Sequence, residues 1–180
     1  MDTMASLNTA PSAEKPDVSH HCSTSGIVGG TVLRAARLSA GLTQGQLAAA
    51  LGADESSVAA WENGTEMLAT LPYAVAERLE GTLAAVGADP ALVRDLTAAT
   101  WCDLVIEAIT GSEDIRCLMC DPIATEQAFA ELVAWSISGD TPDRYSRYVG
   151  PGPLINDCAF AASALQELVA ARPVPSPRAA

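Results

Sequence analysis

The segment from Leu33 to Gly64 reads LRAARLSAGLTQGQLAAALGADESSVAAWENG, and it constrains the fold more than any other part of the chain. Two short stretches with apolar residues at helical spacing flank a break at Leu51–Asp54, which reads LGAD. Thr43-Gln44 opens the first stretch and Asp54-Glu55 opens the second. Two short helices joined by so tight a turn form a helix-turn-helix layout, whose second helix usually enters the major groove of DNA.

Glycines and capping residues set the expected limits of the first two helices. We expect a helix over Gly30–Ala40, ended by Gly41, because glycine adopts the left-handed conformation at little cost. Thr43 is the expected N-cap of the next helix, with Gln46 completing a capping box. Gly52 ends that helix. The side chains expected to face the core in this helix and the following one are Leu47, Ala48, Leu51, Val58 and Trp61.

Further helices follow along the chain. Asp54 would cap the third helix, which Asn63-Gly64 closes, and a fourth runs over about Tyr73–Leu83. Asp89-Pro90 is a favourable start for the longest helix, over about Ala91–Thr110, since Asp caps and Pro suits the first helical position. More helices are expected near 115–120, 125–138 and 156–171. We find no strand alternation and no internal repeat, so the fold class is all-α.

The chain divides into four expected parts. Residues 1–29 form a polar lead that we expect to be disordered, with Gly26–Gly30 as a hinge into the first helix. Residues 30–87 form the helix-turn-helix DNA-binding domain. Residues 89–171 form a helical module for dimerisation or interaction, and the Pro-rich residues 172–180 form a disordered tail.

Charge argues against a simple nucleic-acid binder. The net charge is −12 and the pI is about 4.3, so the whole molecule is not attracted to DNA or to an anionic membrane. No Lys or Arg occurs between Leu38 and Glu77. DNA binding must therefore depend on a local basic face. No apolar run is long enough for a membrane span, and no secretory signal is evident, so we expect a cytoplasmic protein.

Many positions of this segment together resemble the XRE type of helix-turn-helix, the Cro- and phage-repressor-like regulators. The matching positions are Leu33-Arg34, Arg37, Gly41–Gln44, Leu47-Ala48, Leu51-Gly52, Val58, Trp61-Glu62 and Gly64. The resemblance covers about Val32 to Leu83 and implies a compact DNA-binding domain that usually binds an inverted repeat as a dimer. The remainder is more loosely similar to C-terminal parts of actinobacterial regulators of this type. The residues that carry this second similarity are Asp121–Ala124, Trp135, Gly139, Pro142–Tyr145 and Pro151–Leu154.

The predicted DNA face consists of Arg34, Arg37, Thr43, Gln44, Glu55, Ser56 and Ser57. Arg34 and Arg37 would clamp phosphates, although either could instead pair with Glu62 or another acidic neighbour. Gln44 begins the second helix, where its side chain and its backbone N–H could meet a phosphate; the alternative is that it simply favours a helix start.

Glu55, Ser56 and Ser57 open the recognition helix. The resembling family often has Gln at the position of Glu55, which can pair with adenine, whereas Glu can only accept and would select cytosine N4. The alternative for Glu55 is a partner of the helix dipole. Ala59 and Ala60 stand where the family commonly has Ser and Arg, which removes phosphate donors. Trp61 and Glu62 are expected to belong to the scaffold.

Cys117 and Cys120 have the spacing of half a zinc site or of a redox pair. His20, His21, Cys22, Cys102 and Cys158 are further candidate ligands. The alternative is buried free cysteines, which are common. Both histidines lie in the lead, so the folded part lacks a Ser-His or Cys-His arrangement, and we expect neither an enzyme nor a cofactor.

Three hypotheses follow. The first is a dimeric regulator of transcription that binds double-stranded DNA, with a possible protein partner at the C-terminal module. The second is a helix-turn-helix fold that has lost DNA binding and offers an acidic face to a basic protein. The third keeps the DNA role but gates it by zinc or redox state through Cys117 and Cys120.

Overall fold

A computed structural model describes residues 26–110 and 127–155, and the regular secondary-structure elements of these residues are all helices. The elements are α1 (Ile27–Ser39), α2 (Gln44–Leu51), α3 (Glu55–Glu62), the short 3₁₀ helix η1 (Leu68–Thr70), α4 (Tyr73–Ala85), α5 (Pro90–Thr110) and α6 (Gln127–Ser138). The all-α prediction is confirmed. The helices expected near 115–120 and 156–171 lie outside the described residues, as do the predicted tail and all but the end of the predicted lead.

The capping signals are confirmed for α2. The Thr43 side chain accepts a hydrogen bond from the backbone N–H of Gln46 at 3.1 Å, and the Gln46 side chain accepts one from the N–H of Thr43 at 2.8 Å. Gly41 and Gly52 have φ of +70° and +64°, the left-handed conformation that ends a helix. Asp54 stands at the N-cap position of α3, but its side chain makes no capping hydrogen bond there, in contrast to the prediction.

The start of α1 differs from the prediction. The helix begins at Ile27 rather than at Gly30, so Gly29 and Gly30 are buried helical residues and not a hinge. A Cβ added to Gly30 would lie 2.3 Å from the carbonyl oxygen of Trp61, and one added to Gly29 would lie 2.7 Å from a carboxylate oxygen of Asp103. The two glycines therefore allow α3 and α5 to approach the backbone of α1 more closely than any other residue would.

A carboxylate from α5 caps the N-terminus of α1. Asp103 Oδ1 accepts from the N–H of Val28 at 3.0 Å, and Oδ2 accepts from the N–H of Gly29 at 2.8 Å. The Asp103 side chain is buried, and this burial raises its pKa from 3.8 to about 7, although the two backbone N–H groups act in the opposite direction. The cap joins α1 to a residue far along the chain, and local sequence patterns gave no sign of it.

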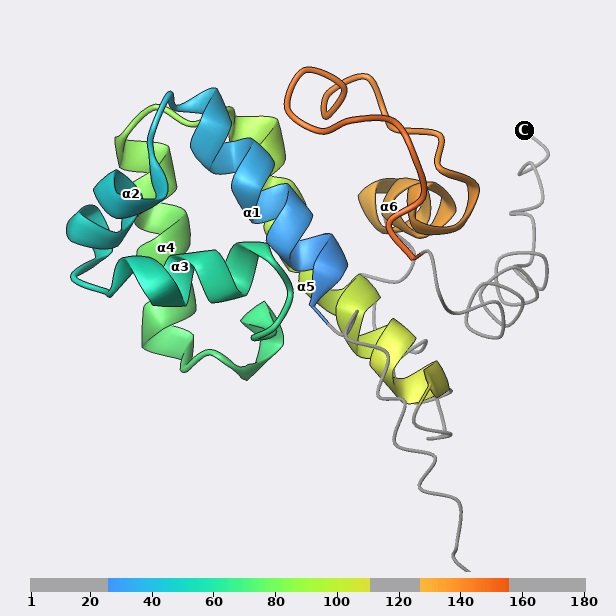
Figure 1. Ribbon diagram of the computed structural model, residues 1–180, viewed down its shortest axis with the longest axis horizontal. Coiled ribbons are helices and arrows are strands. Elements are labelled where there is room, and N and C mark those ends of the chain that lie inside the picture. The colour runs from blue at the N-terminus through green and yellow to red at the C-terminus, as the bar shows by residue number, and fades with distance from the viewer. Residues whose placement is uncertain (1–25, 111–126, 156–180) are drawn as a thin grey trace, which may run out of the picture.

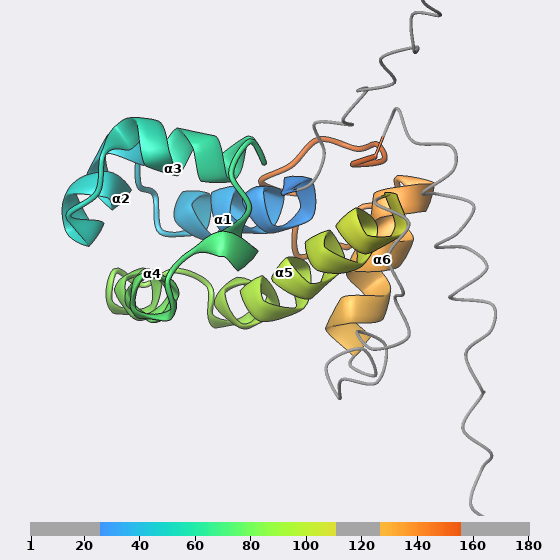
Figure 2. The same ribbon diagram turned by 90° about the horizontal axis from the view of Figure 1, so that it is seen from below.

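The helices pack around α1. Figure 1 shows α1 alongside α5, and α6 also packs against α5. Figure 2 shows α3 on one side of α1 and α4 on the opposite side. One continuous apolar core includes Leu33 of α1, Leu47 of α2, Val58 of α3, Leu83 of α4 and Leu92 of α5. The outer face of α3 is thereby turned away from α4 and α5.

A polar network holds the segment after α6 against α5. The hydroxyl of Tyr145 donates to Asp95 Oδ2 at 2.5 Å, and Arg144 Nε donates to the same oxygen at 2.6 Å. Arg144 also forms an ion pair with Glu131 of α6. The ring of Tyr145 stacks on that of Trp135, with centroids 4.9 Å apart. These contacts hold Arg144 and Tyr145 against α5 and α6, and Tyr148, three residues further on, lines a cleft with Thr31 and Arg34 of α1.

Among the described residues, no helix has the length and apolar character to cross a membrane.

Candidate nucleic-acid interface

The first turn of α3 offers the most accessible side chains of the predicted recognition helix. Glu55 and Ser56 are exposed and Ser57 is half-buried, whereas Val58 and Trp61 are buried against α1. Because Val58 and Trp61 fix one face of this short helix in the core, the opposite face points outward with a defined orientation (Figure 2). Glu55 and Ser56 are therefore the residues of α3 that are best placed to meet a base edge.

The Glu55 carboxylate lies over the first turn of α2. A Cβ added to Gly45 would be 3.1 Å from Glu55 Oε2, which places this carboxylate beside the backbone of the second residue of α2. An anion is stabilised close to a helix N-terminus. Glu55 also lies in the first turn of its own helix, α3, as the helix-dipole interpretation requires, and its exposed side chain can still accept a hydrogen bond from outside.

Arg37 belongs to the scaffold and not to the surface. Its Nε lies 2.5 Å from Glu62 Oε1, its Nη2 lies 2.8 Å from Glu62 Oε2, and its Nη1 donates to the carbonyl of Leu42 at 2.6 Å. The side chains of Arg37 and Glu62 are 8% and 1% exposed. These three hydrogen bonds hold the guanidinium inside the domain, so of the two interpretations the structure shows the alternative, a pair with Glu62.

Gln44 completes this internal network. Its side-chain amide donates to Glu62 Oε2 at 2.8 Å, so Glu62 accepts three hydrogen bonds from two residues. The amide is therefore held and does not reach outward, but the backbone N–H of Gln44 remains at the open start of α2 beside the exposed Thr43. This is the part of Gln44 that could meet a phosphate.

Arg34 is exposed on α1, one turn before Arg37. It lines a cleft of about 220 Å³ together with Thr31 of the same helix, Asn63 at the end of α3, and Tyr148. The cleft brings the segment after α6 next to the predicted DNA face. Sequence patterns do not mark Asn63 or Tyr148 as interface residues. Asn63 has only the pattern of a helix end, and Tyr148 reaches the cleft through the tertiary fold.

The exposed cations of the described residues are Arg34, Arg78, Arg94 and Arg147. None lies on α2 or α3. Arg78 and Arg94 belong to α4 and α5, on the side of α1 away from the outer face of α3, while Arg147 adjoins Tyr148 in the chain. The positive charge near α3 therefore comes from its edge, from Arg34 above all, and not from the recognition helix itself.

Comparison with known proteins gives one family match, over the segment that contains α2 and α3. Residues 30–96 match a family described as a helix-turn-helix domain. The match includes most of α1, all of α2, α3 and α4, and the start of α5. No curated protein and no solved structure matches the chain. The helix-turn-helix domain predicted from the pattern around Leu51–Asp54 is thus confirmed.

The predicted metal or redox pair, Cys117 and Cys120, lies outside the described residues. Within them, no group of three or more His, Cys, Asp or Glu side chains could hold a metal ion. Cys102 is buried, and burial raises the pKa of its thiol well above the ordinary value, with the Asp103 carboxylate acting in the same direction. A protonated, inaccessible thiol of this kind is a core residue.

Proposed function

We propose that this chain is a sequence-specific DNA-binding regulator of transcription that binds an inverted-repeat operator as a homodimer. The observation that carries the proposal is the helix-turn-helix domain at residues 30–96, whose α3 exposes its first turn from a scaffold fixed by Arg37 and Glu62. Such a domain suggests DNA as the partner, and α3 would lie in the major groove.

Each exposed residue then has a role. Arg34 contacts a phosphate at the edge of the groove, and the backbone N–H groups at the start of α2, beside Thr43 and Gln44, contact another. Glu55 accepts a hydrogen bond from cytosine N4, and Ser56 donates to or accepts from a neighbouring base. Ser57, which is half-buried, packs at the margin of this contact.

Binding as a dimer follows from the scarcity of cations. With Arg34 as the main cation beside α3, one domain makes few phosphate contacts, and affinity must come from linking two domains. The helical part after Asp89 is the natural place for the dimer contact or for a protein partner. Two copies of α3 related by a two-fold axis would read the two halves of an inverted repeat.

Selection from a random duplex pool tests the proposal. The intact protein is incubated with the pool, bound duplexes are recovered and sequenced, and the selection is repeated at a higher salt concentration. We expect enrichment of an inverted repeat and a steep loss of binding with salt. The absence of enrichment, together with negligible binding by folded protein at low salt, would contradict the proposal.

The acidity of the same face favours a second candidate, in which the domain binds a basic protein partner instead of DNA. Helices α2 and α3 contain no Lys or Arg, and Glu55 and Glu66 are exposed. Glu62 is buried in the pair with Arg37 and cannot contribute to this acidic face. Reversal of Arg34 to Glu abolishes function if the partner is DNA, whereas neutralising Glu55 and Glu66 abolishes it if the partner is a basic protein.

A further inference from the structure

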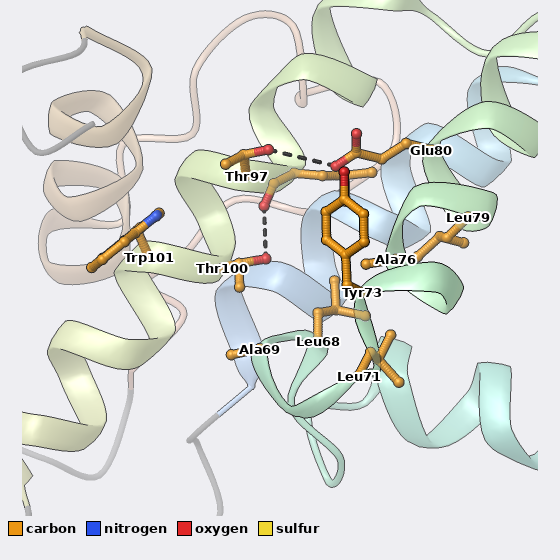
Figure 3. A pocket seen from close by; sticks show the side chains of 11 residues that line it. Leu68, Ala69, Leu71, Tyr73, Ala76, Leu79, Glu80, Thr97, Thr100 and Trp101 are labelled. Carbon is orange, nitrogen blue, oxygen red and sulfur yellow. Dashed lines mark hydrogen bonds between the residues drawn. The ribbon is translucent and has the colours of Figure 1, made fainter. Parts of the chain in front are cut away.

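A second cavity lies away from the candidate nucleic-acid interface. It has a volume of about 290 Å³ and is bounded by η1, α4 and α5 (Figure 3). Leu68, Leu71, Leu79 and Leu96 supply apolar walls. Apolar clefts of roughly this size, with a few polar groups, are the usual form of sites for small molecules.

The polar side of this pocket includes one exposed carboxylate, that of Glu80. Glu80 lines the pocket with Thr97 and Thr100. The hydroxyl of Thr100 donates to the carbonyl of Leu96 at 2.9 Å, and that of Thr97 reaches Glu80 Oε1 only at 3.5 Å. No Lys or Arg lines the pocket, and the ion pairs found among the described residues do not include Glu80.

An exposed aromatic ring lines the same pocket as this carboxylate. Tyr73, the first residue of α4, is 80% exposed, and Figure 3 shows its ring extending from α4 toward Glu80. Trp101 lines the pocket from α5 and is half-buried. The face of an aromatic ring attracts a cation, and a carboxylate next to it adds a direct ionic partner. The pocket therefore combines apolar walls with the aromatic ring of Tyr73 and the negative charge of Glu80.

We propose that this pocket binds a small organic amine with an apolar or aromatic body. The body packs against the leucine walls, and the ammonium group donates to Glu80 with the Tyr73 ring at its side. Charge complementarity decides the class of ligand: an amine neutralises Glu80, a neutral molecule of the same shape leaves it without a partner, and a carboxylic acid is repelled by it.

The pocket is independent of the candidate nucleic-acid interface. It opens between α4 and α5, and Figure 2 shows α4 on the opposite side of α1 from α3. Occupation of the pocket therefore neither requires nor blocks DNA at the outer face of α3. Binding is measurable on the intact protein without DNA, so the test does not depend on the proposed function.

Three probes with the same aromatic body separate the contributions of shape and charge. The intact protein is titrated with 2-phenylethylamine, 2-phenylethanol and 3-phenylpropanoate, and binding is followed by calorimetry and by tryptophan fluorescence, since Trp101 lines the pocket. We expect the amine to bind about tenfold more tightly than the alcohol, which lacks the charge-assisted contact, and the acid to bind least.

Matched variants locate the site. Glu80→Gln should remove the advantage of the amine over the alcohol, whereas Glu77→Gln, which neutralises an exposed carboxylate of the same helix outside the pocket lining, should leave it unchanged. Ala76→Phe places a ring in the pocket and should abolish binding of the amine and the alcohol, with folding verified by circular dichroism. The proposal is overturned if the amine does not bind at millimolar concentrations, if the alcohol binds as tightly as the amine, or if binding survives Ala76→Phe.

Discussion

Replacement of Arg37 by Met tests whether this arginine is a scaffold residue or a contact to DNA. The substitution keeps a long apolar stem but removes the guanidinium that donates to both oxygens of Glu62 and to the carbonyl of Leu42. Glu62, with 1% of its side chain exposed, then keeps only the hydrogen bond from Gln44. A buried carboxylate is left without a countercharge.

The expected cost is large compared with the stability of a small domain. Removal of one partner of a buried ion pair costs about 3–5 kcal/mol. Domains of this size are commonly stable by about 5–15 kcal/mol, so the variant would lose at least about a fifth of that stability. The double variant Arg37→Met with Glu62→Met removes both charges and should recover most of this loss, because replacement of a whole buried pair by apolar residues is often close to neutral.

Urea unfolding of the wild type, the two single variants and the double variant measures these energies in one cycle. Arg34→Met is the matched control, since it makes the same change on the same helix at an exposed position; we expect it to alter the unfolding free energy by no more than about 0.5 kcal/mol. The reasoning is refuted if Arg37→Met is as stable as the wild type, or if the double variant is less stable than both single variants.

Three further predictions concern the packing of the described residues. The pKa of Asp103 is raised from 3.8 to about 7 in the folded protein. Between these two pH values the folded protein keeps a proton on Asp103 that the unfolded chain releases. The unfolding free energy should therefore fall by on the order of 4 kcal/mol as the pH rises from about 4 to about 7. Urea titrations across that pH range should show this fall in unfolding free energy for the wild type and not for Asp103→Asn. An equal dependence on pH in both proteins would refute the prediction. Gly30→Ala should lower the melting temperature strongly because its Cβ would meet the carbonyl of Trp61, whereas Gly81→Ala, with nothing within 4 Å, should raise stability by up to about 1 kcal/mol. Tyr145→Phe removes the hydroxyl that donates to Asp95, so we expect faster proteolytic cleavage within residues 139–155, while the rate of cleavage within α1–α4 stays unchanged. Equal acceleration of cleavage in both regions would indicate global destabilisation instead.

The sequence predicts the features that depend on neighbours along the chain. The capping box of Thr43 and Gln46, the helix ends at Gly41 and Gly52, and the buried face of α2 all follow from residues within one or two turns. The all-α class and the helix-turn-helix domain rest on these local signals. The start of α1 is predicted at Gly30 instead of Ile27 because two consecutive glycines usually interrupt a helix, whereas here close packing requires them.

The features that were missed depend on contacts between distant segments. Asp103 caps α1 from another helix, and no local pattern marks a carboxylate for that role. The sequence left open whether Arg37 binds a phosphate or Glu62, because only the fold decides which partner is within reach. Tyr148 reaches the cleft beside Arg34 for the same reason. Side-chain roles at a surface are therefore less predictable than helix limits.

The salt dependence of DNA binding tests the central claim most directly. Affinity of the intact protein for the enriched duplex is measured over a range of salt concentrations for the wild type, for Arg34→Ala, and for Arg78→Ala, which removes an exposed arginine of α4. If Arg34 contacts one phosphate in each protomer of a dimer, its loss should reduce the slope of log affinity against log salt by about two units, with Arg78→Ala unchanged. Equal slopes for all three proteins, or no binding of any of them to DNA at low salt, would contradict the account.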